Sequence, residues 1–250
     1  MKLNYMQCWN DAMAILRDHK EAILAIAGVF VFLPTLLMAQ FVGQPALEGV
    51  EDLNAITAAY SEFFAENATA IILSNLLISF GGFVIFCTIA PSHSGTVADD
   101  LGKALRLFLI FLLANILTGL ATFFGFLLLV IPGLYVACRL ILVPIIIADH
   151  GERNPIDALK KSWNNTRDNG FSILVLVLMI AIIGAITVGV IQMIVGVVTG
   201  LATSGAGWPL IDNLVSALGG SALQILFTVI IASIYYQLTG KGSEVGEVFS

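Results

Sequence analysis

The stretch LFLIFLLANILTGLATFFGFLLLVIPGLYVACRLILVPIIIA, residues 107–148, decides the fold that this sequence predicts. Arg139 is its only charged side chain. A helix rises about 1.5 Å per residue and crosses a bilayer with about 20 apolar residues, so the stretch is about twice as long as one span. Ile131-Pro132-Gly133 lies near its middle, and Pro-Gly is a strong turn signal. The stretch therefore predicts a tight hairpin of two membrane spans, residues 107–130 and 134–148.

Four further stretches of the chain are apolar enough and long enough to cross a membrane. They are residues 22–42, which contain Pro34, and residues 69–90, 171–198 and 215–236. The composition agrees, because 58% of the residues are hydrophobic and only 11% are charged, whereas soluble domains carry about 25% charged residues. The sequence therefore predicts an all-α fold, a polytopic transmembrane helical bundle with six spans, in which residues 1–250 form a single integral membrane domain.

The basic residues divide sharply between the two sides that six spans define. One side receives both chain ends and the segments 91–106 and 149–170, and the other receives residues 43–67, the hairpin turn and residues 199–214. The first side holds ten basic residues and the second none. The ten are Lys2, Arg17, Lys20, Lys103, Arg106, Arg153, Lys160, Lys161, Arg167 and Lys241. Because short loops rich in Lys and Arg stay in the cytoplasm, we expect both termini to be cytoplasmic.

An amphipathic helix is expected just before the fifth span, over residues 154–169. Asn154-Pro155-Ile156-Asp157 supplies an N-cap residue, a proline in the first turn and an acid near the positive end of the helix. Ile156, Leu159 and Trp163 then share one face, as in a helix that lies on a membrane surface. An ordinary solvated loop helix is the alternative. A comparable apolar face precedes the first span, with Met6, Trp9, Met13 and Leu16.

A polar layer within the membrane is the candidate ligand-binding site. An ionised arginine in hydrocarbon is costly, so Arg139 is a functional candidate by default. Counted from the outer boundary, Arg139 and three polar side chains of other spans, Asn75, Gln192 and Gln224, lie at similar depths, with Asp212 near the mouth above them. Such a layer would attract an anion such as a phosphate headgroup. Alternatively, these side chains link helices to one another, or Arg139 extends its charge to the membrane surface.

Small residues in the fifth span predict close helix packing. Ala181, Ala185 and Gly189 share one face, and Gly196-x-x-x-Gly200 follows at the outer end. Such patterns let helix backbones approach closely, within one chain or between chains.

The sequence contains no recognisable catalytic, cofactor or metal-binding pattern. Cys8, Cys87 and Cys138 are scattered, and His19, His93 and His150 are far apart in the sequence. A metal site of His150 and Asp149 with Asp99 and Asp100 lacks ligand spacing such as HxxxH. No phosphate-binding loop, GxGxxG or GxSxG motif occurs. We therefore expect a protein that is not an enzyme and that uses no cofactor or metal.

Three short motifs give a resemblance to known membrane proteins. They are Val130-Ile131-Pro132-Gly133-Leu134-Tyr135, then Pro144-Ile145-Ile146, and Ala158-Leu159-Lys160-Lys161-Ser162-Trp163-Asn164-Asn165-Thr166. This pattern resembles that of the YciC-type bacterial inner-membrane proteins and of the membrane region beside some glycerophosphodiester phosphodiesterase domains. The resemblance implies a polytopic helical fold and a bacterial inner-membrane location. The phosphodiesterase chemistry belongs to a separate soluble domain, so the resemblance carries over no catalytic residue.

These observations leave three classes of function. The first is a non-enzymatic integral inner-membrane protein of the YciC type with a structural or envelope-related role. The alternative is a transporter or a lipid- or anion-handling protein that uses the polar layer around Arg139. An intramembrane enzyme ranks last, because the spans lack paired acids or histidines. Membrane lipids are the expected partners and nucleic acid is not, since no run of four basic residues occurs. Pairing with a second copy or with another membrane protein stays open.

Overall fold

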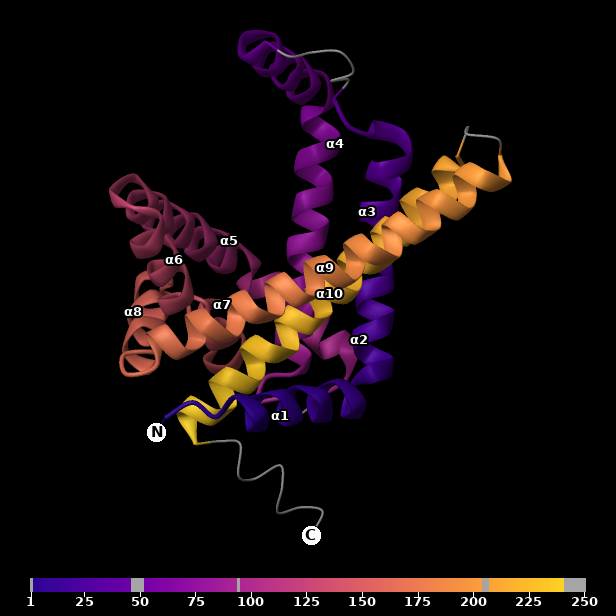
Figure 1. The fold of residues 1–250 in the computed structure, drawn as a ribbon. Helices are drawn as coiled ribbons and strands as arrows, with labels where there is room; N and C mark the ends of the chain where they lie inside the picture. Colours follow the sequence, from indigo (N-terminus) through magenta and orange to yellow (C-terminus); the bar gives the residue numbers. More distant parts are fainter. Residues whose placement is uncertain (1, 46–51, 94, 204–206, 241–250) are drawn as a thin grey trace.

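The computed structural model describes residues 2–45, 52–93, 95–203 and 207–240. These residues form helices and contain no strands (Figure 1). Within them, six helical segments are long and apolar enough to cross a membrane: Lys20–Val42, Leu53–Thr88, Val97–Leu128, Val130–His150, Gly170–Ala202 and Pro209–Thr239. The predicted all-α fold with six membrane-spanning segments is confirmed at this level, and the helices are those of a multi-pass membrane protein.

The first span follows a separate N-terminal helix. Helix α1 (Tyr5–Asp18) begins at Asn4, whose side chain accepts hydrogen bonds from the N–H groups of Met6 and Gln7. The span itself is made of α2 (Lys20–Ala27), the π-helical turn η1 (Gly28–Phe32), α3 (Leu33–Leu37) and a second π-helical turn, η2 (Met38–Val42). Pro34 follows η1 directly within a continuous helical run, and the π-helical turn accommodates the backbone where proline removes an N–H donor. Proline therefore interrupts the regular helix without ending the span.

The second and third spans are longer than hydropathy indicates. Helix α4 (Leu53–Thr88) has 36 residues and starts at Asp52, whose carboxylate accepts from the N–H of Ala55. The sequence places residues 43–67 outside the spans, and most of this segment continues α4, because alanine and glutamate favour helix even where no lipid surrounds it. Residues 46–51 lie outside the described residues. Helix α5 (Val97–Leu128) starts with a capping box between Thr96 and Asp99.

The hairpin exists, but its turn is not at Pro132-Gly133. The chain reverses at Leu129, and α6 (Val130–Arg139) already contains Pro132 in its first turn. A proline fits there because the first N–H groups of a helix have no partner within the helix. Gly133 and Gly125 instead bring the two helices together, since a Cβ at Gly125 would lie 2.8 Å from the Cα of Gly133. The predicted position of the turn was therefore wrong by a few residues.

The fourth span is broken. Helix α6 ends at Arg139, and α7 (Val143–His150) begins after a turn at residues 140–142. Pro144 lies in the first turn of α7, where it is compatible with a new helix but not with the continuation of the old one. Gly151 ends α7 with a φ of +60°, a left-handed conformation that glycine adopts without strain. The sequence predicts a span over residues 134–148, and the structure has one over Val130–His150, whose internal break the sequence does not predict.

Two long antiparallel helices complete the bundle. Helix α8 (Pro155–Asn165) precedes α9 (Gly170–Ala202), and α10 (Pro209–Thr239) returns beside it. In Figure 1, α9 and α10 cross the molecule side by side, α1 lies across the lower end of α10, and the α5–α6 hairpin leans away to one side of α4. The helices therefore spread apart above a common packed end.

That common end collects the segments that carry the basic residues, and we call it the basic end. The N–H of Leu3 donates to Oδ1 of Asn169, and the side-chain amide of Gln237 donates to the carbonyl of Asn4. The N–H of Ser92 donates to Asp149. Contacts between residues distant in the chain thus join the N-terminal segment, the α4–α5 and α7–α9 connections and the end of α10. The largest fully buried side chains, among them Ile23, Phe83, Ile146, Ile173 and Tyr235, lie in the helices that meet here.

Candidate functional site

Arg139 lies buried, with 4% of its surface exposed, and its guanidinium holds the end of α8. Its Nη1 donates to the hydroxyl of Tyr135 at 2.9 Å and to the carbonyl of Arg167 at 3.3 Å, and its Nη2 donates to the carbonyl of Trp163. The guanidinium carbon also lies 4.3 Å from the centre of the Trp163 ring. The last carbonyls of a helix carry partial negative charge, so the cation stabilises the C-terminal end of α8.

Side chains of α8 and of the residue after it also bond to the backbone of Arg139. The hydroxyl of Ser162 donates to the backbone carbonyl of Arg139 at 2.8 Å, and the Thr166 hydroxyl lies 3.1 Å from the same carbonyl and 2.8 Å from that of Ser162. The Arg139 carbonyl ends α6 and has no acceptor role left within its own helix. The motif at residues 158–166 therefore has a structural explanation: it closes the break in the fourth span and docks α8 against it.

The predicted polar layer around Arg139 is not present as a unit. Arg139 lies beside Gly170, where an added Cβ would be 2.7 Å from the Arg139 Cδ. Gln192 is about six turns farther along α9, or about 33 Å at about 1.5 Å per residue. The prediction counted depth from the hairpin turn and assumed an upright hairpin. Since the α5–α6 hairpin leans to one side (Figure 1), this depth does not carry over to α9, and Arg139 lies beside Gly170 at the start of α9.

The other four predicted site residues lie in three places, because Gln192 and Asp212 line one small cavity of about 80 Å³ between α9 and α10. Gln192 donates to Ser216 at 3.1 Å, and Asp212 accepts from Thr199 at 3.3 Å, so both lie between the outer halves of α9 and α10. Gln224 faces α4, because a Cβ at Gly82 would lie 3.3 Å from its Nε2. Asn75 donates to the carbonyl of Ile71 in its own helix. The four thus do not form one layer, and ligand binding by these residues stays a prediction.

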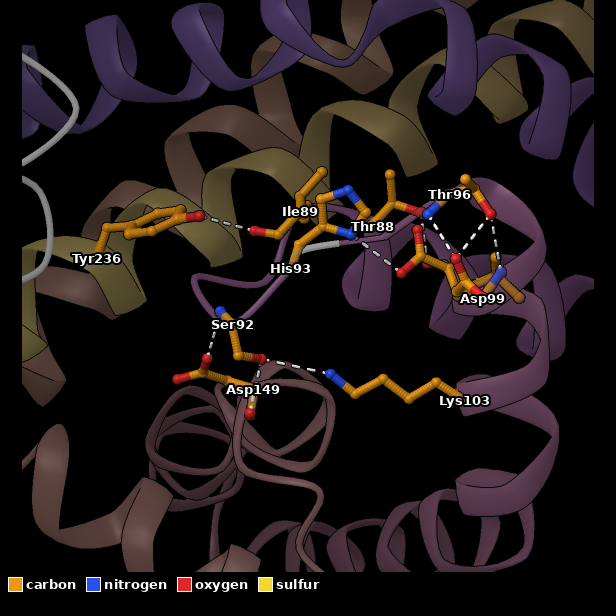
Figure 2. Close-up of polar contacts among 11 residues, drawn as sticks. Thr88, Ile89, Ser92, His93, Thr96, Asp99, Lys103, Asp149 and Tyr236 are labelled. Carbon is orange, nitrogen blue, oxygen red and sulfur yellow. Dashed lines mark hydrogen bonds and ion pairs between the residues drawn. The ribbon is translucent and has the colours of Figure 1, made fainter. Parts of the chain in front are cut away.

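A polar cluster that hydropathy does not reveal lies at the basic end (Figure 2). The carboxylate of Asp149 accepts from the N–H of Ser92 at 2.9 Å and from the hydroxyl of Tyr235 at 2.6 Å. The Ser92 hydroxyl donates to the Asp149 carbonyl, and the ammonium group of Lys103 donates to that hydroxyl at 3.3 Å. The hydroxyl of Tyr236 donates to the carbonyl of Ile89. The cluster therefore ties α7, α5 and α10 to the α4–α5 connection.

Two histidines lie at the edge of this cluster. His93 is 3.1 Å from a carboxylate oxygen of Asp100, and the His19 ring packs edge-on against the His93 ring at 6.0 Å. Burial lowers the pKa of His19 from its ordinary value, and the nearby His93 lowers it further. Within the described part of the chain, no three His, Cys, Asp or Glu side chains are placed to hold a metal ion.

An apolar groove of about 560 Å³ runs between α9 and α10 and is bordered by α1 at the basic end. Its walls are mostly aliphatic, and its mouth carries Tyr5 and Trp9 of α1. A hydroxyl on its α9 wall, that of Thr187, is bonded to the carbonyl of Ile183. Ligand pockets typically measure about 300–1,000 Å³, so the groove is large enough for part of an apolar molecule.

Two glycines that line this groove allow α9 and α10 to pack closely. A Cβ at Gly184 would clash with a methyl carbon of Leu223, and one at Gly219 would lie 2.8 Å from Val188. These positions let α9 and α10 approach closely. Gly189, Gly196 and Gly200, which the sequence favours for packing, have no such neighbour among the described residues. Within the chain, the close approach is therefore made by Gly184 and Gly219, and packing of Gly189, Gly196 and Gly200 against a second chain stays a prediction.

The fold defines a multi-pass helical membrane protein with an apolar groove between two of its spans. The family model that is described as "Domain of unknown function (DUF7847)" matches residues 119–238, which run from the end of α5 to the last turn of α10. This region contains Arg139, α8 and both long walls of the groove. The curated proteins and the solved structures contain no match to the chain.

Proposed function

We propose that this protein is a non-enzymatic, lipid-binding structural protein of a bacterial inner membrane, of the YciC type. The groove between α9, α10 and α1 is the observation that carries the proposal. It lies along two helices that are apolar enough to span a membrane, so hydrocarbon is the medium that it faces. An acyl chain of one membrane phospholipid is its proposed occupant.

The mouth of the groove suits the headgroup region of such a lipid. Tyr5 and Trp9 are 40% and 43% exposed, and aromatic rings of this kind concentrate at membrane interfaces. Helix α1 packs against α10 and carries them to one end of the groove (Figure 1). The acyl chain would lie between the long helices, with its polar end beside α1.

The distribution of charge supports a cytoplasmic basic end. Of the ten basic residues that the sequence assigns to that side, only Lys241 lies outside the described residues. Helices α1 and α8 then lie at the cytoplasmic surface of the membrane, as their apolar faces indicate. In Figure 1, α1 runs across the helix ends rather than along them, which suits a helix at the membrane surface.

A transport role for an Arg139-centred layer loses its support. The carbonyls of Trp163 and Arg167 and the Tyr135 hydroxyl already accept from the two terminal nitrogens of the guanidinium, and its buried Nε is the donor without a partner among the described residues. A substrate anion would have to replace these bonds and release α8. The groove between α9 and α10 is the better candidate for lipid binding, because a lipid can enter it without breaking a contact within the protein.

Native mass spectrometry of the detergent-extracted protein tests the proposal. Ala222 is exposed in the groove, so Ala222→Phe fills it, whereas Ala185 is exposed on α9 outside it and gives the matched control Ala185→Phe. The wild type and Ala185→Phe should retain one phospholipid that Ala222→Phe loses. Equal lipid retention by all three proteins would contradict the proposal.

A further inference from the structure

A second cavity, of about 460 Å³, lies at the basic end and has a different character. The first turns of α5 form one wall and the connection after α7 forms the other. Three basic side chains line it: Lys103 and Arg106 of α5, and Arg153 of the connection. Lys103 and Arg106 are three residues apart and so lie on one helix face.

The positive charge of this cavity is not balanced from within. None of the ion pairs found among the described residues involves Lys103, Arg106 or Arg153. In the described part of the chain, Asp99 is the one acidic residue of the lining, and its carboxylate accepts from both the N–H and the hydroxyl of Thr96. That carboxylate therefore serves the start of α5.

Two other acids are close in the sequence, and each has a different partner: Asp100, three residues before Lys103, contacts His93 at 3.1 Å, and the second is Glu152. Glu152 precedes Arg153 in the chain but pairs with Lys161 of α8. The hydrogen bond from Lys161 lowers the pKa of Glu152 from its ordinary value. Gly151, just before it, has the left-handed conformation that turns the connection at the end of α7. Arg153 is left on the cavity wall without an acidic partner among the described residues.

We propose that Lys103, Arg106 and Arg153 form a binding site for a phosphate group. Arginine matches phosphate with a planar fork of donors, and lysine adds a compact charge. Basic pockets beside membrane helices bind phospholipid headgroups in this way. The cavity is open, and Arg106 and Arg153 are exposed, so a lipid headgroup or free phosphate can enter. The site is separate from the groove between α9 and α10 and does not depend on it.

The chain offers a variant that blocks the cavity without changing its charge. Gly102 lines the cavity, and a Cβ there would meet no atom within 4 Å. Gly102→Leu therefore places a side chain in the open space, and replacement of glycine favours the helix. Arg106→Gln removes one charge, and Arg17→Gln on α1, 79% exposed and outside the cavity, removes one elsewhere on the basic end.

Two titrations of the detergent-purified full chain test the site. One uses inorganic phosphate, and the other uses micelles that contain phosphatidylglycerol, with phosphatidylcholine micelles as the reference. Binding in the first identifies free phosphate as sufficient, and binding only in the second identifies a lipid headgroup; either supports the site. Arg106→Gln and Gly102→Leu should each weaken the observed binding about tenfold, and Arg17→Gln should not.

The site is contradicted if the wild type binds neither probe. It is equally contradicted if Gly102→Leu binds as tightly as the wild type, because binding then reflects diffuse attraction to the basic end. Ala222→Phe should leave phosphate binding unchanged, so failure of the groove proposal and failure of this one give different results.

Discussion

The hydroxyl of Tyr235 donates a hydrogen bond of 2.6 Å to a carboxylate oxygen of Asp149, which joins the end of α10 to the end of α7. Both side chains are buried, and 86 residues separate them in the sequence. The same carboxylate accepts from the N–H of Ser92, so one acid connects three segments. This bond lies at the centre of the packed basic end and makes it a single structural unit.

Removal of the Tyr235 hydroxyl should therefore destabilise the protein. A buried hydrogen bond to a carboxylate contributes about 1–3 kcal/mol, and Tyr235→Phe should lower the free energy of unfolding by that amount. Tyr236→Phe is the matched control, because its hydroxyl donates to the neutral carbonyl of Ile89 and should contribute less. Unfolding in a titration of denaturing detergent measures both, and a larger effect of Tyr236→Phe would refute this ranking.

Replacement of Arg139 should release α8. Arg139→Gln leaves the carbonyls of Trp163 and Arg167 without their cationic donor, a loss of about 1.5–3 kcal/mol. Arg139→Lys should not restore the contact, because an ammonium cannot reproduce the planar fork. Limited proteolysis within residues 151–169 reports the release. Arg167→Gln is the control, since the exposed Arg167 contributes its backbone carbonyl, and cleavage equal to that of Arg139→Gln would contradict this role of Arg139.

A methyl group at Gly133 should open the α5–α6 hairpin. An added Cβ would lie 2.5 Å from the ring of Phe126 and 2.8 Å from its backbone nitrogen. Overpacking of this kind costs about 1–3 kcal/mol, so Gly133→Ala should lower thermal stability. Gly119→Ala on α5 has no neighbour within 4 Å and should be neutral or slightly stabilising. Equal thermal stability of the two variants would show that the helices do not meet at Gly133.

The stability of the basic end should depend on pH through His19. Its pKa is lower in the folded protein than in the unfolded chain, so the unfolded state binds the proton first as the pH falls. Stability should therefore decrease below about pH 6.5, the ordinary histidine value, until His19 is also protonated in the folded state. His19→Gln should flatten the change in unfolding free energy between about pH 7 and pH 5. An unchanged slope in the variant would exclude His19 as its source.

The sequence predicted those features that the thickness of a membrane imposes. Runs of about 20 apolar residues identify spans whatever their neighbours are, and all six were found. The helical residues 53–67 were missed because hydropathy registers lipid contact and not helix formation. The break between α6 and α7 went unnoticed because Pro144 lies in an apolar run that is otherwise continuous.

The tertiary partners of polar residues were beyond the reach of the sequence. The number of residues from the outer membrane boundary predicted similar depths for Arg139 and Gln192. In the structure the α5–α6 hairpin leans to one side, and Arg139 contacts α8 instead. Asp149 and His150 attracted attention only as metal ligands, whereas the structure pairs Asp149 with Tyr235. Which face of α9 meets α10 depends on the neighbour, so the sequence alone did not distinguish Gly184 from Gly189.

Photocrosslinking with a phospholipid that carries a diazirine near the carboxyl end of its acyl chain, close to the headgroup, tests the central claim most directly. Met179 lines the groove and is 44% exposed, whereas Met193 lies farther along α9, outside the groove, and is 72% exposed. We predict that mapped crosslinks concentrate at Met179 and the neighbouring groove residues, and that Ala222→Phe removes them. Crosslinks that follow exposure, with more at Met193 than at Met179, would contradict a lipid held between α9, α10 and α1.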